Sequence, residues 1–180
     1  AARRRGERAG EIAAGGGGIV RTVTATRAAS EHELIAGGRA RLAEMLALGT
    51  TTAEAKSGYG LDLETELRML RAIKVLATTQ PVELTATFMG AHEVPVEYRG
   101  RRTEYVRLIV DDMIPAVAGA GLAEWCDVFC ETGVFTPAES QAILEAGARH
   151  GLKPRIHADE LGLSGGAAVA ATVGARSADH

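Results

Sequence analysis

The stretch "TPAESQAILEAGARHGLKPRIHADE" (136–160) decides the fold, because a clearly signalled helix and a strand follow one another within it. Thr136, Pro137 and Glu139 have the order of a helix N-cap, a first helical residue and a capping-box partner. Gly151 is typical of a helix end, and "KPRIHADE" (153–160) is predicted to be a strand. A helix joined to a strand by so short a gap is half of a parallel βαβ unit.

The same unit recurs along the chain. Apolar residues at steps of three and four predict further helices, and runs bounded by turn residues predict further strands. Pro115 is expected to kink or break one of these helices. The predicted helices are 30–49, opening on Ser30 and Glu33 as a capping box, 62–78, 102–121 and 165–175; the predicted strands are 50–60, 82–92, 124–133 and the start of one at 176–180.

Five strands alternating with helices fit either a doubly wound sheet or a (β/α)8 barrel. His92, Glu131, His157 and His180 each end a different successive strand. In a barrel these ends converge on one mouth, whereas in an open sheet they spread along an edge. A whole barrel needs about 250 residues. We therefore expect an α/β fold that is a partial (β/α)8 TIM barrel of the amidohydrolase type, with about five βα units.

Residues 1–180 are expected to be a fragment of this single domain, with a loop-rich segment at 1–29 and successive αβ units at 30–180. The chain begins without Met and stops where a strand begins, so we expect both ends to be cut. The glycine run "GGGG" (15–18) lacks the GK[ST] of a phosphate loop, and we interpret it as a mobile loop or lid.

The composition is that of a soluble globular protein, with 46% hydrophobic and 24% charged residues. A net charge of −3 gives no reason to expect nucleic acid or an anionic membrane as a partner. No run approaches the ~18 apolar residues of a membrane span, and no signal peptide is evident, so a cytoplasmic protein is expected. Cys126 and Cys130 lie four apart, a spacing of neither a zinc ribbon nor a redox pair, and are expected to be buried thiols.

The strongest candidate for chemistry is "HADE" (157–160). His157 could bind zinc or iron, and Glu160 could move protons between a bound water and a leaving nitrogen. The alternative is a structural imidazole followed by carboxylates that cap the next helix, and for Asp159 this is the simplest interpretation. A catalytic metal needs about three protein ligands, and only His157 and His180 are available here. His32 and His150 lie on predicted helices and are expected at the surface.

In "KSGYG" (56–60), Lys56 lies at a strand end and Tyr59 lies in a tight loop between two glycines. Tyr59 is therefore expected to be exposed enough to donate a hydrogen bond to a ligand. Packing as a lid hinge is an equally acceptable interpretation of this residue.

Longer strings place these residues in a known context. The chain from about residue 15 to 180 resembles an internal segment of the imidazolonepropionase family, within the metal-dependent amidohydrolase superfamily. The strings that show the resemblance are "GTTTAEAKSGYGLDLETELRMLRAI", "TFMGAHEVPVEY", "DVFCETGVF", "HADELGLSGGA" and "GARSADH".

The resemblance implies hydrolysis of the cyclic amide of 4-imidazolone-5-propanoate to N-formimidoyl-L-glutamate, a step of histidine degradation, by a water activated by one Zn or Fe ion. It implies His157 as a metal ligand, His180 and Glu160 as catalytic residues that manage protons, and Tyr59, His92 and Glu160 as substrate-binding residues. His92 would also help the metal to stabilise an oxyanion.

Other positions of the family have no counterpart in this chain: an HxH pair and an Arg near the first barrel strand, and an Asp on the eighth. Two-metal members of the superfamily have a bridging Lys on the fourth strand, which "CDVFCETG" lacks, so one metal is predicted. The resemblance leaves open the metal and whether the intact protein is a homodimer.

Two alternatives follow from the same residues. A purine or pyrimidine aminohydrolase of the same superfamily could use His-x-x-Glu on a fifth strand equally well. A catalytically silent α/β fragment, or a binding module that kept only the scaffold, would need none of this chemistry.

Overall fold

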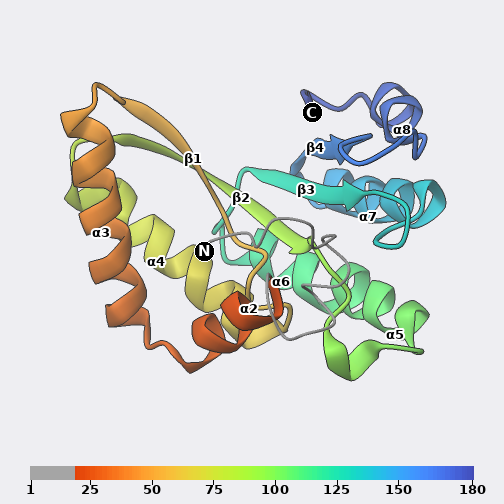
Figure 1. The fold of residues 1–180 in the computed structure, drawn as a ribbon, viewed down its shortest axis with the longest axis horizontal. Coiled ribbons are helices and arrows are strands. Elements are labelled where there is room, and N and C mark those ends of the chain that lie inside the picture. The colour runs from red at the N-terminus through yellow and green to blue at the C-terminus, as the bar shows by residue number, and fades with distance from the viewer. Residues whose placement is uncertain (1–18) are drawn as a thin grey trace, which may run out of the picture.

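The computed structural model describes residues 19–180. Its helices and strands follow the order predicted from the sequence (Figure 1). The helices are α2 (Ile19–Ala28), α3 (Glu31–Ala47), α4 (Leu63–Thr79), α5 (Arg102–Arg107), α6 (Ile114–Gly119), α7 (Pro137–Arg149) and α8 (Gly166–Val173); the strands are β1 (Thr52–Lys56), β2 (Glu83–Ala91), β3 (Trp125–Cys130), β4 (Lys153–Ala158) and β5 (Ala178–Asp179).

Local side-chain chemistry sets the helix boundaries, as predicted. Ser30 accepts a hydrogen bond from the Glu33 N–H at 3.2 Å, and the Glu33 carboxylate accepts from the Ser30 N–H at 2.8 Å. Thr136 and Glu139 make the same capping box at the start of α7. Gly151 follows the last residues of α7 with a φ of +85°, a left-handed conformation that costs glycine little.

The N-terminal region differs from the expectation. Residues 1–29 were predicted to be loop-rich, but residues 19–28 form α2, which places Val23 in the hydrophobic core. Contact with the core outweighs the weak helix propensity of β-branched residues in this segment. The glycine run at 15–18 lies outside the described residues.

The helix is distorted near Pro115, as expected, although its backbone stays helical at both ends of the distortion. A π-helical turn, Leu108–Met113, separates α5 from α6, and Pro115 lies in the first turn of α6. Proline has no N–H to donate to the carbonyl four residues earlier, and its ring crowds that carbonyl. A widened turn before Pro115 accommodates both effects.

The sheet contains five parallel strands in the order β1-β2-β3-β4-β5. Each strand therefore pairs only with its neighbours in the sequence. A doubly wound sheet reverses its strand order at a switch point, and this sheet does not. The partial (β/α)8 barrel predicted from the strand-end residues is confirmed.

The sheet is strongly curled. The Lys56 ammonium on β1 lies 2.6 Å from the Asp127 carboxylate on β3 and 3.3 Å from the Asp179 carboxylate on β5. In a flat sheet the first and fifth strands would be about 19 Å apart, four strand spacings of about 4.8 Å. One lysine side chain can reach both carboxylates only because the strands bend around it. The five strands thus form about half of a barrel wall.

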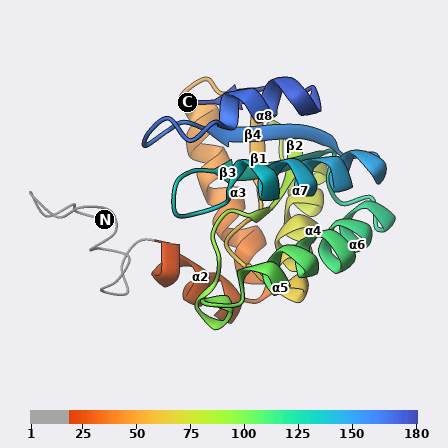
Figure 2. The same cartoon turned by 90° about the vertical axis from the view of Figure 1, so that its right-hand side faces the viewer.

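Helices α4, α7 and α8 pack against the outer side of the curled sheet (Figures 1 and 2). Strand residues that face these helices are apolar and almost completely buried; they include Phe88, Cys126, Val128 and Ile156. Both cysteines are buried free thiols, as predicted. The hydrophobic core therefore lies between sheet and helices, and polar strand residues are left for the concave side.

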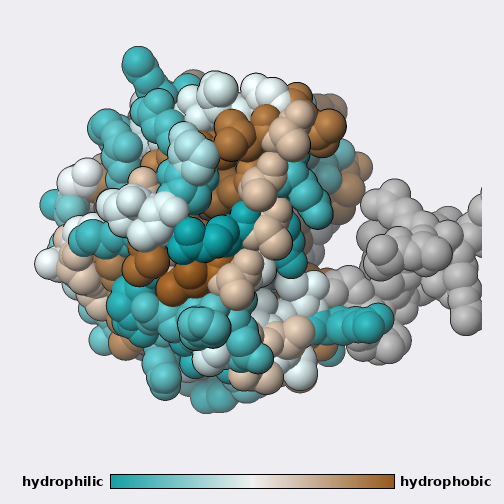
Figure 3. All heavy atoms as spheres, turned by 90° about the vertical axis from the view of Figure 1, so that its left-hand side faces the viewer, coloured by the Kyte–Doolittle hydropathy of each residue, from teal (hydrophilic) through white to brown (hydrophobic). Residues whose placement is uncertain are grey.

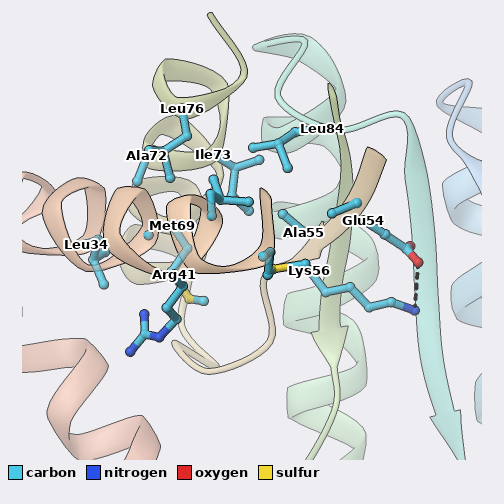
Figure 4. Close-up of a pocket in the computed structure, with 14 residues that line it drawn as sticks. Leu34, Arg41, Glu54, Ala55, Lys56, Met69, Ala72, Ile73, Leu76 and Leu84 are labelled. Carbon is cyan, nitrogen blue, oxygen red and sulfur yellow. Dashed lines mark ion pairs between the residues drawn. The ribbon is translucent and has the colours of Figure 1, made fainter. Parts of the chain in front are cut away.

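Both sheet edges are open within residues 19–180, since β1 pairs only with β2 and β5 only with β4. Beside β1, helices α3 and α4 border an apolar groove, which is lined in part by Leu34, Met69 and Leu84 (Figure 4). Figure 3 shows apolar atoms on this side of the molecule. The Lys56 side chain extends from this groove toward β3 (Figure 4). None of the predicted site residues lines the groove.

Among the described helices, none combines the length and apolar character needed to cross a membrane.

The close contact of α7 with β3 yields a stability prediction. A Cβ added at Gly147 would lie 2.9 Å from the Cys126 Cβ, whereas a Cβ at Gly119, also helical, would meet nothing within 4 Å. Gly147→Ala should lower the free energy of unfolding by about 1–3 kcal/mol. Gly119→Ala should leave it unchanged or raise it by up to about 1 kcal/mol, because alanine favours helix. Urea unfolding of both variants tests this, and equal stabilities would contradict the packing described.

Candidate active site

The C-terminal ends of the strands bring the predicted site residues together. Tyr59 follows β1, His92 follows β2, His157 lies near the end of β4, and His180 follows β5. Their rings form a row: Tyr59 and His92 have centroids 4.9 Å apart, and His157 and His180 are 5.3 Å apart. Phe129 of β3 lies between, 6.2 Å from both His92 and His157. We call this end of the half-barrel the mouth.

The other two histidines lie on the surface, as predicted. His32 on α3 and His150 after α7 are both exposed. Neither of them lies at the mouth.

The loop that contains Tyr59 is held by a buried carboxylate. Glu66 of α4 is fully buried and accepts hydrogen bonds from the N–H groups of Gly58, Gly60 and Leu61, at 2.9, 2.8 and 2.9 Å. The Gly58 carbonyl in turn lies 2.9 Å from His92 Nδ1. Burial lowers the pKa of the His92 imidazole, although this hydrogen bond opposes the shift.

A β-bulge shapes the end of β2 just before His92. Phe88 pairs with Cys126 but Ala91 pairs with Val128, so β2 contains one residue more than β3 over this stretch. The carbonyl of Gly90 within the bulge accepts a hydrogen bond from the Tyr105 hydroxyl at 2.7 Å. Bulges bend a strand and redirect the residues that follow.

His157 is oriented by a second buried carboxylate. Its Nδ1 lies 3.1 Å from the fully buried Asp127 carboxylate, which also accepts from the Lys56 ammonium. Burial opposes both charges, but the contacts of Lys56 with Asp127, Glu54 and Asp179 together outweigh it and raise the pKa of Lys56. Contact with His157 and Lys56 likewise lowers the pKa of Asp127 despite its burial. Because Nδ1 is engaged, Nε2 is the His157 nitrogen left for a ligand.

The donor atoms at the mouth fit a metal only in part. Asp127, His157 and Asp179 each offer one atom within 4.8 Å of the others. Both carboxylates already form ion pairs with Lys56, whereas within residues 19–180 the Nε2 of His157 has no such partner. An imidazole ligand oriented by a carboxylate suits zinc or iron. A catalytic metal takes about three protein ligands, and His157 Nε2 could be one of them.

Glu160 and His180 face one another at the outer side of the mouth. The Glu160 carboxylate lies 3.7 Å from His180 Nε2, and both side chains are exposed to solvent. The His180 ring also neighbours the His157 ring. A carboxylate and an imidazole in this position can exchange protons with a molecule bound at the mouth.

Asp159 caps the helix that follows it, as the simplest interpretation of the sequence predicted. Its φ is +59°, and its carboxylate accepts from the N–H groups of Ser164, Gly165 and Ala167 at 2.7, 3.0 and 3.2 Å. The Ser164 hydroxyl also donates to this carboxylate and makes the largest contribution to lowering the pKa of Asp159, and the backbone hydrogen bonds lower it further. Asp159 thus caps the start of α8, while Glu160, which was considered for the same role, turns toward His180.

Glu131, another strand-end residue, supports the loop that contains Glu160. Its carboxylate accepts from the Leu161 N–H and the Thr132 N–H, both at 2.8 Å. These bonds lower the pKa of Glu131. The Glu131 carboxylate therefore ties the end of β3 to the loop after β4.

Sequence reasoning did not identify Glu66 and Asp127. Both could have been found, because each is a carboxylate at a position where the pattern demands an apolar residue. Glu66 lies four residues before Leu70 on the buried stripe of α4, and Asp127 interrupts the apolar strand "WCDVFC". A charge at such a position needs an internal partner.

The search against protein-family models found no match for this chain. Curated imidazolonepropionases, in contrast, match it closely. Those of Myxococcus xanthus and Symbiobacterium thermophilum are 55% and 57% identical over 94% of the chain, and that of Haloarcula marismortui is 53% identical over 100% of it. The resemblance inferred from the sequence strings is confirmed.

The matched segment is a limited part of these proteins. It covers 40% of the Myxococcus and Symbiobacterium proteins and 42% of the Haloarcula protein. The chain therefore spans about two fifths of the length of the curated relatives it matches.

The role of Glu131 can be tested by amide hydrogen exchange. Glu131→Ala should speed exchange of the Leu161 amide by about tenfold or more, because a hydrogen bond to a charged group is lost. The exposed Glu145→Ala on α7 is the matched control and should leave this amide unchanged.

The same amide should also report pH. Since the folded-state pKa of Glu131 is lowered, its stabilisation of the loop is complete above the ordinary glutamate pKa of about 4.3. Protection should be lost as the pH falls through the lowered folded-state value. Protection of Leu161 that is equal in the Glu131→Ala variant and the parent chain would contradict this account.

Proposed function

We propose that this chain is the central part of a hydrolase that opens the cyclic amide of 4-imidazolone-5-propanoate to give N-formimidoyl-L-glutamate. The observation that carries the proposal is the convergence of His157, Glu160 and His180 at one mouth, in a chain 52–57% identical to imidazolonepropionases. An imidazole ligand, a carboxylate and a second imidazole are the groups that amide hydrolysis by an activated water requires.

The proposal includes one zinc or iron ion held in part by His157 Nε2. Such an ion, when bound, lowers the pKa of water from about 16 toward about 7 and polarises a carbonyl. Asp127 supports the fit, because it engages His157 Nδ1 and so leaves Nε2 directed to a ligand. The remaining ligands would come from parts of the longer protein.

Glu160 and His180 would manage the protons. Their side chains lie 3.7 Å apart and are open to the mouth, so a proton taken up by one can pass to the other or to the substrate. We assign to Glu160 the delivery of a proton to the leaving ring nitrogen, and to His180 the position facing the attacking water.

Tyr59 and His92 would bind the substrate. Their rings lie side by side, on the loops after β1 and β2, at the end of the row of rings that is opposite to His180. Their polar atoms can fix the substrate while its amide faces His157 and Glu160.

Glu160→Gln in the full-length protein tests the proton role. The catalytic rate on imidazolonepropanoate should fall by about 10²- to 10⁴-fold, because glutamine keeps the shape but cannot donate a proton of suitable pKa. Metal content should stay close to that of the parent. The exposed Glu44→Gln on α3 is the matched control.

The outcomes separate the alternatives. Normal turnover by Glu160→Gln would exclude the assigned role. Parallel assays with guanine and cytosine test for an aminohydrolase, and turnover of either in place of imidazolonepropanoate would overturn the proposed substrate.

Metal analysis of the 180-residue chain provides a separate prediction. With His157 as the free imidazole ligand among residues 19–180, the chain alone should retain little zinc or iron after dialysis. His157→Ala should remove what is retained, and His150→Ala, at an exposed position, should not. Stoichiometric metal that survives dialysis would contradict the ligand assignment.

A further inference from the structure

The mouth contains a buried charge that the proposed mechanism does not use. Glu66 is 0% exposed, and among the ion pairs of residues 19–180 none includes it. A buried carboxylate without a cation is costly unless several donors surround it. Glu66 has three backbone donors, all from the loop that contains Tyr59. The hydrogen bonds of Glu66 therefore stabilise the shape of that loop.

The loop has little freedom to adopt another shape. Gly58 has a φ of +97°, and a Cβ there would lie 2.7 Å from the Met89 carbonyl oxygen. A Cβ at Gly60 would lie 2.7 Å from the Thr65 Cβ. The loop is thus closely packed on both sides of Tyr59, in a shape that directs the Gly58 N–H to Glu66 and the Gly58 carbonyl to His92.

The Gly58 carbonyl determines which nitrogen of His92 bears a proton. A carbonyl oxygen only accepts hydrogen bonds, so the 2.9 Å contact requires that His92 Nδ1 is the donor. In the neutral ring the other nitrogen, Nε2, is then unprotonated and can only accept. Burial lowers the pKa of His92 and so favours the neutral ring.

We propose that Glu66 is a positioning residue that acts through the Gly58 peptide to hold His92 as the Nδ1–H tautomer, with Nε2 presented to the substrate as a hydrogen-bond acceptor. The matching group on the substrate is an N–H or O–H donor, such as the ring N–H of a cyclic amide. This differs from the expectation that His92 stabilises an oxyanion, which needs a donor. The inference rests on the proposed function for the identity of the substrate.

The tautomer can be measured directly by nitrogen-15 NMR of the histidine rings in the full-length protein, with the His92 signals assigned by their loss in His92→Asn. The expected result is a protonated Nδ1 and an unprotonated Nε2. In Glu66→Gln the ring should populate both tautomers, because an amide nitrogen in place of Oε2 cannot accept the Gly58 N–H and the Gly58 peptide is held less firmly. A His92 ring that is protonated on Nε2 in the parent protein would overturn the proposal.

Kinetics provide the second readout. Glu66→Gln should raise KM for imidazolonepropanoate by about tenfold, a ratio equal to ~1.4 kcal/mol, and should change kcat much less, because binding contacts are lost equally in ground and transition states. Metal content should not change. Glu64→Gln, exposed on the same helix turn, is the matched control. Equal KM values for the two variants would overturn the positioning role.

The inference can still be tested if the Glu66→Gln variant does not fold or if the proposed activity is absent. If Glu66→Gln does not fold, Glu66→Asp keeps the charge but shortens its reach, and an unchanged KM in that folded variant would contradict the proposal. If the parent protein does not hydrolyse imidazolonepropanoate, the proposed function fails, whereas the tautomer of His92 and its dependence on Glu66 still decide the inference.

Discussion

The ammonium of Lys56 connects the two outer strands of the half-barrel across the concave side of the sheet. It joins carboxylates on β3 and β5 to β1, and so spans a sheet whose outer strands would otherwise lie far apart. Two negative charges can be kept inside the curl because one positive charge lies between them. Asp127, held in this way, can also orient His157. The curl therefore brings Lys56, Asp127 and His157 into contact, and these contacts set part of the geometry of the mouth.

Carboxylates that accept backbone hydrogen bonds organise the mouth at three further points. Glu66 fixes the loop after β1, Glu131 fixes the loop after β4, and Asp159 caps the helix that follows. Each accepts backbone N–H groups, which are abundant where a strand turns into a loop. Loops that would otherwise be mobile are therefore held by neighbouring elements, and the exposed Glu160 lies on a rigid support.

The half-barrel explains why the mouth is recognisable and yet incomplete. Successive parallel strands with right-handed crossovers place all their carboxyl ends on one side, so even five strands gather several functional groups. A catalytic metal takes ligands from strands on both sides of a barrel, and this chain spans about 40% of the relatives it matches. The described residues thus bring together the metal ligand, the proton-transfer groups and the substrate-binding groups that we propose.

Local chemistry and the topology of parallel strands were enough to predict the order of the elements, the capping boxes at Ser30 and Thr136, the distortion near Pro115 and the convergence of the mouth histidines. Other features depend on tertiary contacts. Residues 19–28 became helix α2 through contact with the core. The partners of Lys56 and Glu66, and hence the free nitrogens of His157 and His92, depend on distances between residues far apart in the chain, which no local pattern specifies.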